Sequence, residues 1–298
     1  MKKKGSIVLL VLILGLFFAL ILLRNTKPVD NSRFVEPDKL YKTLEANIRS
    51  QDAYEIIVDI DHARLAKEVE SPMPPSHVLI WSDPKLETEI LKINPVAAVD
   101  LPLRTLAFED PASGKAAVIT NSFDFLMNRH GLPDDPAIRG RYETAVTKAI
   151  KDIPSENIVS FSSDKMLDAG LITLNSPYDF NTTETRIRDA INAQDDTVFF
   201  ATVDFKKRAK KSGVTLAPLR LILFGAPGPG GKAMSEAPIL GLDAFCQKML
   251  IWKDTSGSVH VTFNDLLILA EHQKLSYGIP LRVINYRIKK TFSEALEQ

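Results

Sequence analysis

Apolar residues recur along the chain with helical spacing and in strand-like clusters, and the same order of patterns occurs twice. Helical spacing is seen in two sets: Leu40, Leu44 and Ile48, and Thr183, Ile187 and Ile191. Such spacing places the apolar side chains on one face of a helix, which can then pack on a core. Each set is followed by a cluster of β-branched and aromatic residues, at 54–60 and 198–203, which predicts a strand.

Further elements are predicted in matching pairs. Opening strands are expected at 33–35 and 170–174, with Asp38 and Asn181 as the N-caps of the helices that follow. Short helices are expected at 62–70 and 205–212, buried strands at 78–81 and 221–224, and hairpins at 103–120 and 249–263. The Ser-Gly pairs at 113–114 and 256–257 are the predicted hairpin turns. Two helices are expected to close each half.

The two halves align without a gap when the sequence is shifted by 143 residues, which places 38–132 on 181–275. The alignment pairs Asp100 with Asp243, Asn121 with Asn264, and Pro84 with Pro227. Coinciding prolines and turn residues indicate a shared backbone geometry, so the chain contains two copies of one structural unit. The net charges of 33–153 and 170–298 are −5 and +3, which is compatible with packing of the copies as a pseudo-twofold pair.

The repeat sets the domain organisation and the fold class. We expect a first module at 26–153, a serine-rich linker at 154–168 and a second module at 169–298. Strands outnumber the helices able to connect parallel strands, and the hairpins require antiparallel pairing. The sequence therefore predicts an α+β fold of two tandem modules, each an antiparallel sheet with helices, rather than a doubly wound parallel sheet.

Residues 1–25 have the pattern of a membrane anchor. Positions 7–23 carry no charge and follow three lysines. At about 1.5 Å per residue they span roughly 25 Å, close to the thickness of a bilayer core. The run lacks a small-residue cleavage pattern, which favours an uncleaved single-pass helix over the alternative, a cleaved signal peptide. The preceding lysines favour a cytoplasmic N-terminus, with the rest of the chain in the periplasm or outside the cell.

Composition narrows the function classes. The 298-residue chain has 37 basic and 37 acidic residues, and this balance argues against a general nucleic-acid binder. The single cysteine, Cys246, excludes an internal disulfide and a cysteine-rich metal site. It falls in a hydrophobic stretch, so we expect it to be buried and inert.

Several motifs in one order resemble the domain-of-unknown-function 302 family. The first copy has Ile60-Asp61-His62-Ala63, Asp100-Leu101-Pro102-Leu103 and Arg129-His130-Gly131-Leu132, and the second has Phe224-Gly225-Ala226-Pro227. The resemblance covers about 260 of the 298 residues. It implies an α+β fold similar to that of the TATA-binding protein. It implies no activity, since a fold by itself carries no function.

The copies depart from the family pattern in opposite ways. The first keeps the histidine motifs but lacks the glycine loop, whereas the second keeps the glycine loop but has Phe205 in place of His62. Neither copy alone preserves every motif. One site shared between the copies would explain this division.

His62 and His130 are the candidate metal ligands or acid–base groups. A histidine titrates near neutral pH and is a common metal ligand, so the pair would suit a metal- or haem-dependent enzyme or redox protein. A structural role is favoured for both histidines. His62 would flank Asp61 as a helix N-cap, and His130 would lie at a helix end before a left-handed Gly131. No sequential metal-ligand spacing links them.

The other candidates for ligand binding are Asp100, Arg129, Gly225, Gly231 and Asp243. The two aspartates occupy the same place in both copies, where they would do acid–base work or stabilise turns. The glycine-rich segment from Gly225 to Gly231 follows a strand, but its prolines lack the N–H groups of a phosphate loop. A tight turn beside a pocket fits it better.

These observations favour a membrane-anchored, non-catalytic tandem module that binds a small ligand or a protein partner where the copies meet. The alternative is a metal- or haem-dependent protein that uses His62 and His130. Neither the ligand nor the number of chains in the assembly follows from the sequence.

Overall fold

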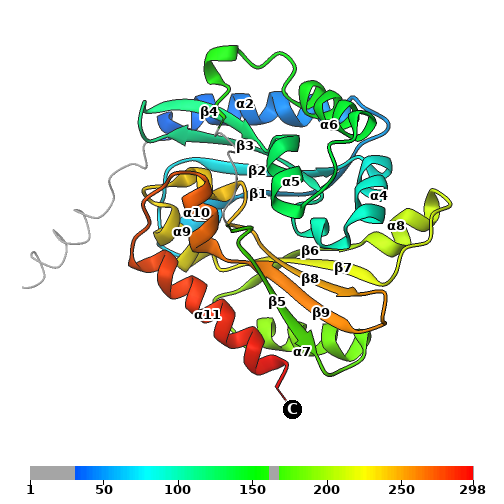
Figure 1. Ribbon diagram of the computed structural model, residues 1–298. Helices are drawn as coiled ribbons and strands as arrows, with labels where there is room; N and C mark the ends of the chain where they lie inside the picture. The colour runs from blue at the N-terminus through cyan, green and yellow to red at the C-terminus, as the bar shows by residue number, and fades with distance from the viewer. Residues whose placement is uncertain (1–30, 161–167, 298) are drawn as a thin grey trace, which may run out of the picture. The chain divides into compact units, whose positions relative to one another are not determined.

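Two antiparallel sheets form the framework of the fold, and the second has one additional edge strand, β5, beside four strands in the same order as the first (Figure 1). The computed structural model describes residues 31–160 and 168–297. The first sheet has the order β1-β2-β3-β4 and the second β5-β9-β8-β7-β6. The strands of the first are β1 (Glu55–Asp61), β2 (Ser76–Ser82), β3 (Leu103–Asp110) and β4 (Lys115–Thr120). Those of the second are β5 (Leu171–Ser176), β6 (Val198–Asp204), β7 (Leu219–Gly225), β8 (Gln247–Lys253) and β9 (Val259–Asn264).

The helices occupy equivalent places in the two copies. The first copy has α2 (Ser32–Arg49), α3 (His62–Glu68), α4 (Pro84–Ile93), α5 (Phe123–His130) and α6 (Pro136–Ala149). The second has α7 (Phe180–Asn192), α8 (Phe205–Lys211), α9 (Pro227–Met234), α10 (Leu266–His272) and α11 (Ile279–Ala295). Short 3₁₀ helices, η1 (Pro95–Val99) and η3 (Pro238–Gly241), follow α4 and α9, and η2 (Ser155–Asn157) follows α6. The predicted α+β repeat is thereby confirmed.

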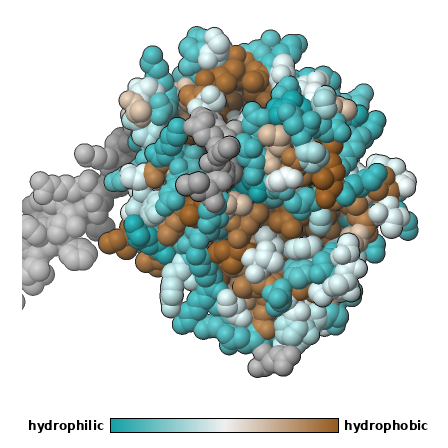
Figure 2. Space-filling view, viewed as in Figure 1, coloured by the Kyte–Doolittle hydropathy of each residue, from teal (hydrophilic) through white to brown (hydrophobic). Residues whose placement is uncertain are grey.

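The amphipathic helices bury the faces that their spacing predicts. Leu40, Leu44 and Ile48 of α2 are buried, as are Thr183, Ile187 and Ile191 of α7. Tyr41 of α2 stacks on His77 of β2 with ring centroids 3.5 Å apart, so α2 lies on the first sheet. In Figure 1, α7 and α11 run beside the second sheet. The hydropathy view in Figure 2 shows hydrophilic residues interspersed with smaller hydrophobic areas on this face.

The copies pack through a reciprocal exchange of their short 3₁₀ helices. The first copy's η1 contacts β7, β8 and β9 of the second sheet, and the second copy's η3 contacts β2 and β3 of the first. The helices between the sheets pair in the same way, α3 with α9 and α8 with α4. Residues Glu36–Gln298 therefore form one compact unit that contains both copies. This agrees with the expected pseudo-twofold pair.

Three details of the predicted elements are wrong. Residues 33–35 form no strand but begin α2, and Asp38 lies inside that helix instead of capping it. Three residues are too few for strand alternation to be distinguished from a helix turn. In the second copy Asp179, two residues before Asn181, is the N-cap.

The gapless alignment also fails in one strand. Phe108 pairs with Ser76 at the start of β2, and Trp252 pairs with Leu219 at the start of β7. Ser76 and Leu219 are 143 residues apart, whereas Phe108 and Trp252 are 144 apart. The counterpart of Arg104 is therefore Lys248.

The predicted anchor at 7–23 lies outside the described residues, as do residues 161–167 of the predicted linker. Within the described parts of the chain, no helix is long and apolar enough to cross a bilayer.

Candidate functional site

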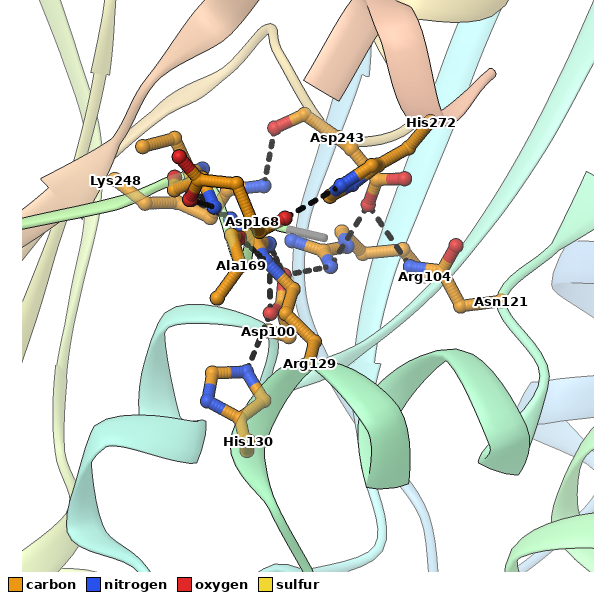
Figure 3. A network of polar contacts seen from close by, with 12 residues as sticks. Asp100, Arg104, Asn121, Arg129, His130, Asp168, Ala169, Asp243, Lys248 and His272 are labelled. Atoms are coloured by element: carbon orange, nitrogen blue, oxygen red, sulfur yellow. Dashed lines mark hydrogen bonds and ion pairs between the residues drawn. The ribbon is translucent and has the colours of Figure 1, made fainter. Parts of the chain in front are cut away.

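A buried network of charged residues lies where the two copies meet (Figure 3). Asp100 follows η1 and Asp243 follows η3, so the exchange of the 3₁₀ helices brings both carboxylates between the sheets. Both residues are almost fully buried, at 4% and 1% exposure. A carboxylate can be buried at this depth only where charged and hydrogen-bonding partners replace water.

The Asp100 carboxylate binds three cation-bearing or polar groups of its own copy. Arg129 donates from Nη1 to both carboxylate oxygens at 2.8 Å, and Arg104 donates from Nη2 at 3.0 Å. His130 Nε2 lies 2.6 Å from Oδ2. Burial alone would raise the pKa of Asp100, but Arg129 and His130 hold that pKa well below its usual value. Asp100 is therefore ionised at neutral pH.

Asp243 is held by residues from both copies. Arg104 and Asn121, both of the first copy, approach Oδ1 at 2.9 and 2.8 Å. Lys248 donates from Nζ to the backbone carbonyl of Asp243 at 2.6 Å. Burial, together with the nearby Arg104 charge, lowers the pKa of Lys248 to about 7.

Arg129 also donates hydrogen bonds to residues of the second copy. Its Nη2 donates to Asn264 Oδ1 at 2.8 Å, and its Nε donates to the Ala169 carbonyl at 2.7 Å. Asn264 is the repeat counterpart of Asn121, so each copy lends one asparagine to the charged residues of the other. The cross-copy contacts pair the carboxylates with the guanidinium groups, and the side chains of Asp100, Arg104, Arg129 and Asp243 are at most 2% exposed. We interpret it as the polar core of the interface between copies.

The structure thus groups four of the predicted site residues, Asp100, Arg129, His130 and Asp243, in one network. Sequence reasoning missed Arg104, Lys248, Asn121 and Asn264. Signals were available: Arg104 is a charge inside an apolar strand, and Asn121 and Asn264 are identical in the two copies. A charged residue in a buried strand requires a partner, but the sequence does not show that the partner lies in the other copy.

A second group forms a small pocket that we name the His62 pocket. It is lined by His62 and Leu65 of the first copy and by Phe200, Gly225, Ala226, Pro227, Gly230, Met234, Phe245 and Cys246 of the second. Its cavity volume is about 20 Å³. That volume suffices for a ligand the size of a water molecule or a single ion.

His62 belongs to the lining of this pocket, and its Nε2 lies beside Gly241, which is not among the lining residues. The side chain begins α3, is 7% exposed, and its Nε2 makes no hydrogen bond among the described residues. Burial lowers the pKa of His62 to about 4, against an opposing contact with the Gly241 backbone. The imidazole is therefore neutral at pH 7. A buried nitrogen without a partner costs about 1–3 kcal/mol, which a bound ligand would offset.

Gly225 lines the His62 pocket, but Gly231 has a different role. A Cβ atom on Gly231 would lie 2.5 Å from the Ser71 carbonyl oxygen and 2.7 Å from Ala66 Cβ. The absence of a side chain lets α9 approach the end of α3, where Ser71 Oγ donates to the Gly228 carbonyl at 2.8 Å. Gly231 therefore brings the two copies into close contact.

The equivalent position in the other half is filled. Phe205 replaces His62, Arg208 replaces Leu65, and Glu87 replaces Gly230. Phe205 and Glu87 are each 1% exposed, and Arg208 Nε lies 3.7 Å from Glu87 Oε2. The Phe205 ring and the Glu87 and Arg208 side chains thus occupy the twin of the His62 pocket. The His62 pocket thus lies on the side of the interface where the first copy keeps its histidine and the second keeps its glycine loop.

Glu87 predicts an unusual pH dependence of stability. Burial raises the pKa of Glu87 to about 8, although Arg208 opposes the shift. A carboxyl whose pKa is raised on folding contributes its full stabilisation of the folded state below its unfolded pKa, near 4.5. This contribution is lost as the pH rises through the folded pKa of about 8. Glu87→Gln should remove this loss, which is at most about 5 kcal/mol at 1.36 kcal/mol per pH unit.

Urea unfolding at pH 5 and pH 8.5 measures the effect. The wild-type midpoint should fall more steeply between the two pH values than the Glu87→Gln midpoint. Glu89→Gln on the same helix, where the side chain is 37% exposed, is the matched control and should keep the wild-type slope. Equal slopes for wild type and Glu87→Gln would contradict the prediction.

His62 and His130 are not brought together. His130 is committed to Asp100, and it is absent from the lining of the His62 pocket. Among the described residues, one group of three metal-ligating side chains is compact enough for an ion: Asp38, Asp61 and His77. Arg64 already pairs with both carboxylates there. The expectation of a metal held by His62 together with His130 has no support in this geometry.

The comparisons with known proteins agree with the repeat. The family model described as "Domain of unknown function DUF302" matches residues 29–153 and again 172–294. The chain belongs to the DUF302 family. Its two DUF302 repeats coincide with the two sheets and their helices.

Curated relatives match part of the chain. Two proteins named "Fluoride-specific ion channel FluC 1", from Brucella suis biovar 1 and Brucella abortus biovar 1, are each 34% identical over 110 residues. The match covers 37% of this chain and 42% and 40% of theirs, so the chain spans well under half the length of these relatives.

One solved DUF302 structure is also similar. The crystal structure of an uncharacterised conserved DUF302 protein from Bacillus stearothermophilus is 14% identical, with a TM-score of 0.36. The match covers 43% of this chain and 95% of that one.

Proposed function

We propose that the chain is a non-catalytic binding protein whose ligand occupies the His62 pocket at the junction of the two DUF302 repeats. The buried His62 Nε2 without a hydrogen-bond partner carries this proposal. Retaining such a group lowers stability unless something binds it.

The ligand is small. A cavity of about 20 Å³ admits one ion or a molecule the size of water. Because two relatives are named as fluoride-specific channels, fluoride belongs among the ligands to be tested. The proposal also includes a membrane tether formed by residues 7–23, which would hold the DUF302 repeats at the periplasmic or outer surface.

The experiment compares wild type with His62→Phe, the substitution that the second repeat already carries. The full chain is washed on membranes with high salt, extracted with detergent and tested by ligand-observed NMR against fluoride and other single-ion or two- to three-atom probes. We expect detergent-dependent extraction and at least one probe that binds wild type and not His62→Phe.

Leu216→Phe is a control for enlargement of a buried apolar side chain elsewhere, since Leu216 lies outside the lining of the His62 pocket. It should bind as wild type does. Release of the chain by salt would exclude the tether. Equal binding by wild type and His62→Phe for every probe would exclude the His62 pocket as the ligand site.

A further inference from the structure

Three side chains that bind soft metal ions line the His62 pocket. His62 comes from the first repeat, and Met234 and Cys246 come from the second. All three are buried, with 7%, 2% and 3% exposure. We infer that the His62 pocket binds one Cu(I) ion through the His62 imidazole, the Met234 thioether and the Cys246 thiolate. This inference rests on the proposed function, because it names the ligand of the same pocket.

The three donor atoms have few competing partners among the described residues. His62 Nε2 makes no hydrogen bond there. Cys246 Sγ contacts the Gln247 carbonyl at 3.8 Å and the Phe224 backbone. A thioether is a weak acceptor in any setting. An ion bound by these side chains would therefore displace few existing contacts.

The chemistry of the lining favours Cu(I) over other ions. Thiolate and thioether ligands select Cu(I), and imidazole suits copper as well. No carboxylate is among the lining residues, so the pocket lacks the oxygen ligands that magnesium and calcium need. The cavity has room for a single ion rather than for a haem or another organic group.

Charge balance separates Cu(I) from Zn²⁺. Cu(I) displaces the thiol proton of Cys246 to solvent and forms a copper–sulfur bond without a change of oxidation state. The product, one monovalent cation with one thiolate, is neutral. Zn²⁺ with the same ligands would leave one positive charge in an apolar pocket, where an uncompensated charge is costly.

The twin position supports a single site in each chain. The repeat counterparts of His62 and Met234 are Phe205 and Leu91, and neither side chain binds metal ions. Histidine and methionine thus occur together on the side where the cavity is open, and phenylalanine and leucine occur together on the side where it is filled.

The test is an anaerobic competition between the full chain, purified in detergent with its thiol reduced, and the chromophoric Cu(I) chelator bicinchoninate. Wild type should withdraw one equivalent of Cu(I). Cys246→Ser, His62→Phe and Met234→Leu should each weaken Cu(I) binding by at least about 10-fold, because loss of a residue that only supports a metal ligand already costs about 10- to 100-fold. Met249→Leu, a buried methionine outside the pocket, is the matched control and should bind Cu(I) as wild type does.

Near-ultraviolet circular dichroism of each variant confirms that it is folded. No withdrawal of Cu(I) by wild type would overturn the inference. So would loss of binding in Cys246→Ser alone, with His62→Phe and Met234→Leu unchanged, since that result describes a cysteine acting by itself. If Cu(I) does not bind but another small probe binds in a His62-dependent way, the copper assignment is wrong and the proposed function stands. If no probe depends on His62, both are wrong.

Discussion

Replacement of Asp100 by alanine is expected to destabilise the chain by about 3–5 kcal/mol, the usual cost of removing one partner from a buried ion pair. The substitution would leave the guanidinium of Arg129 without its bidentate partner, although that side chain is 0% exposed. Arg104 would keep Asp243 as its only carboxylate. Loss of Asp100 therefore weakens the interface between the repeats as well as the first repeat.

Urea unfolding followed by far-ultraviolet circular dichroism measures this loss. Glu45→Ala is the surface control, because Glu45 pairs with Arg49 in an exposed i, i+4 bridge whose removal costs below about 1 kcal/mol. Asp100→Asn, which keeps the shape but not the charge, should fall between the two. An Asp100→Ala midpoint equal to that of wild type would contradict the role assigned to the network.

Gly231→Ala is expected to destabilise the chain by about 1–3 kcal/mol, the range found for overpacked cores. The new methyl group would meet the Ser71 carbonyl oxygen at 2.5 Å, and a backbone atom cannot move aside as a side-chain end can. The helices α3 and α9 would have to separate, which would also disturb the Ser71–Gly228 hydrogen bond.

A second glycine in a helix provides a matched control for this prediction. Gly140 lies within α6, and a Cβ there would meet no atom within 4 Å. Gly140→Ala should therefore raise stability by about 0.4–1 kcal/mol, since alanine favours the helix and restricts the unfolded chain. Differential scanning calorimetry of both variants gives the comparison. Destabilisation by Gly140→Ala, or a neutral Gly231→Ala, would show that helix contact is not the cause.

The sequence predicted the elements that depend on local pattern. Apolar spacing in α2 and α7 identified their buried faces, and the coincidence of Pro84 with Pro227 identified the repeat. These signals are local, because the periodicity of a helix and the backbone restriction of proline act over a few residues. The antiparallel α+β architecture followed from them, and the DUF302 match confirms the repeat.

The sequence did not predict contacts that depend on how the copies meet. Asn121 reaches Asp243 over a separation of 122 residues, and Arg129 reaches Asn264 over 135. The insertion that makes Lys248 the counterpart of Arg104 leaves no mark in a low-identity alignment. Cys246 was expected to be inert, and burial does raise the pKa of its thiol to about 12. Its place beside His62 and Met234 became apparent only with the fold.

Covalent joining of the repeats has a consequence for how the network can change. In a symmetric dimer of one repeat, every substitution would appear twice at the interface, and its free-energy cost would be doubled. In the joined chain each change occurs once. Gln273 stands where His130 stands in the first repeat, and it contacts Asp243 at 3.4 Å, against 2.6 Å for His130 and Asp100. One half can therefore weaken while the stronger half keeps the whole chain folded.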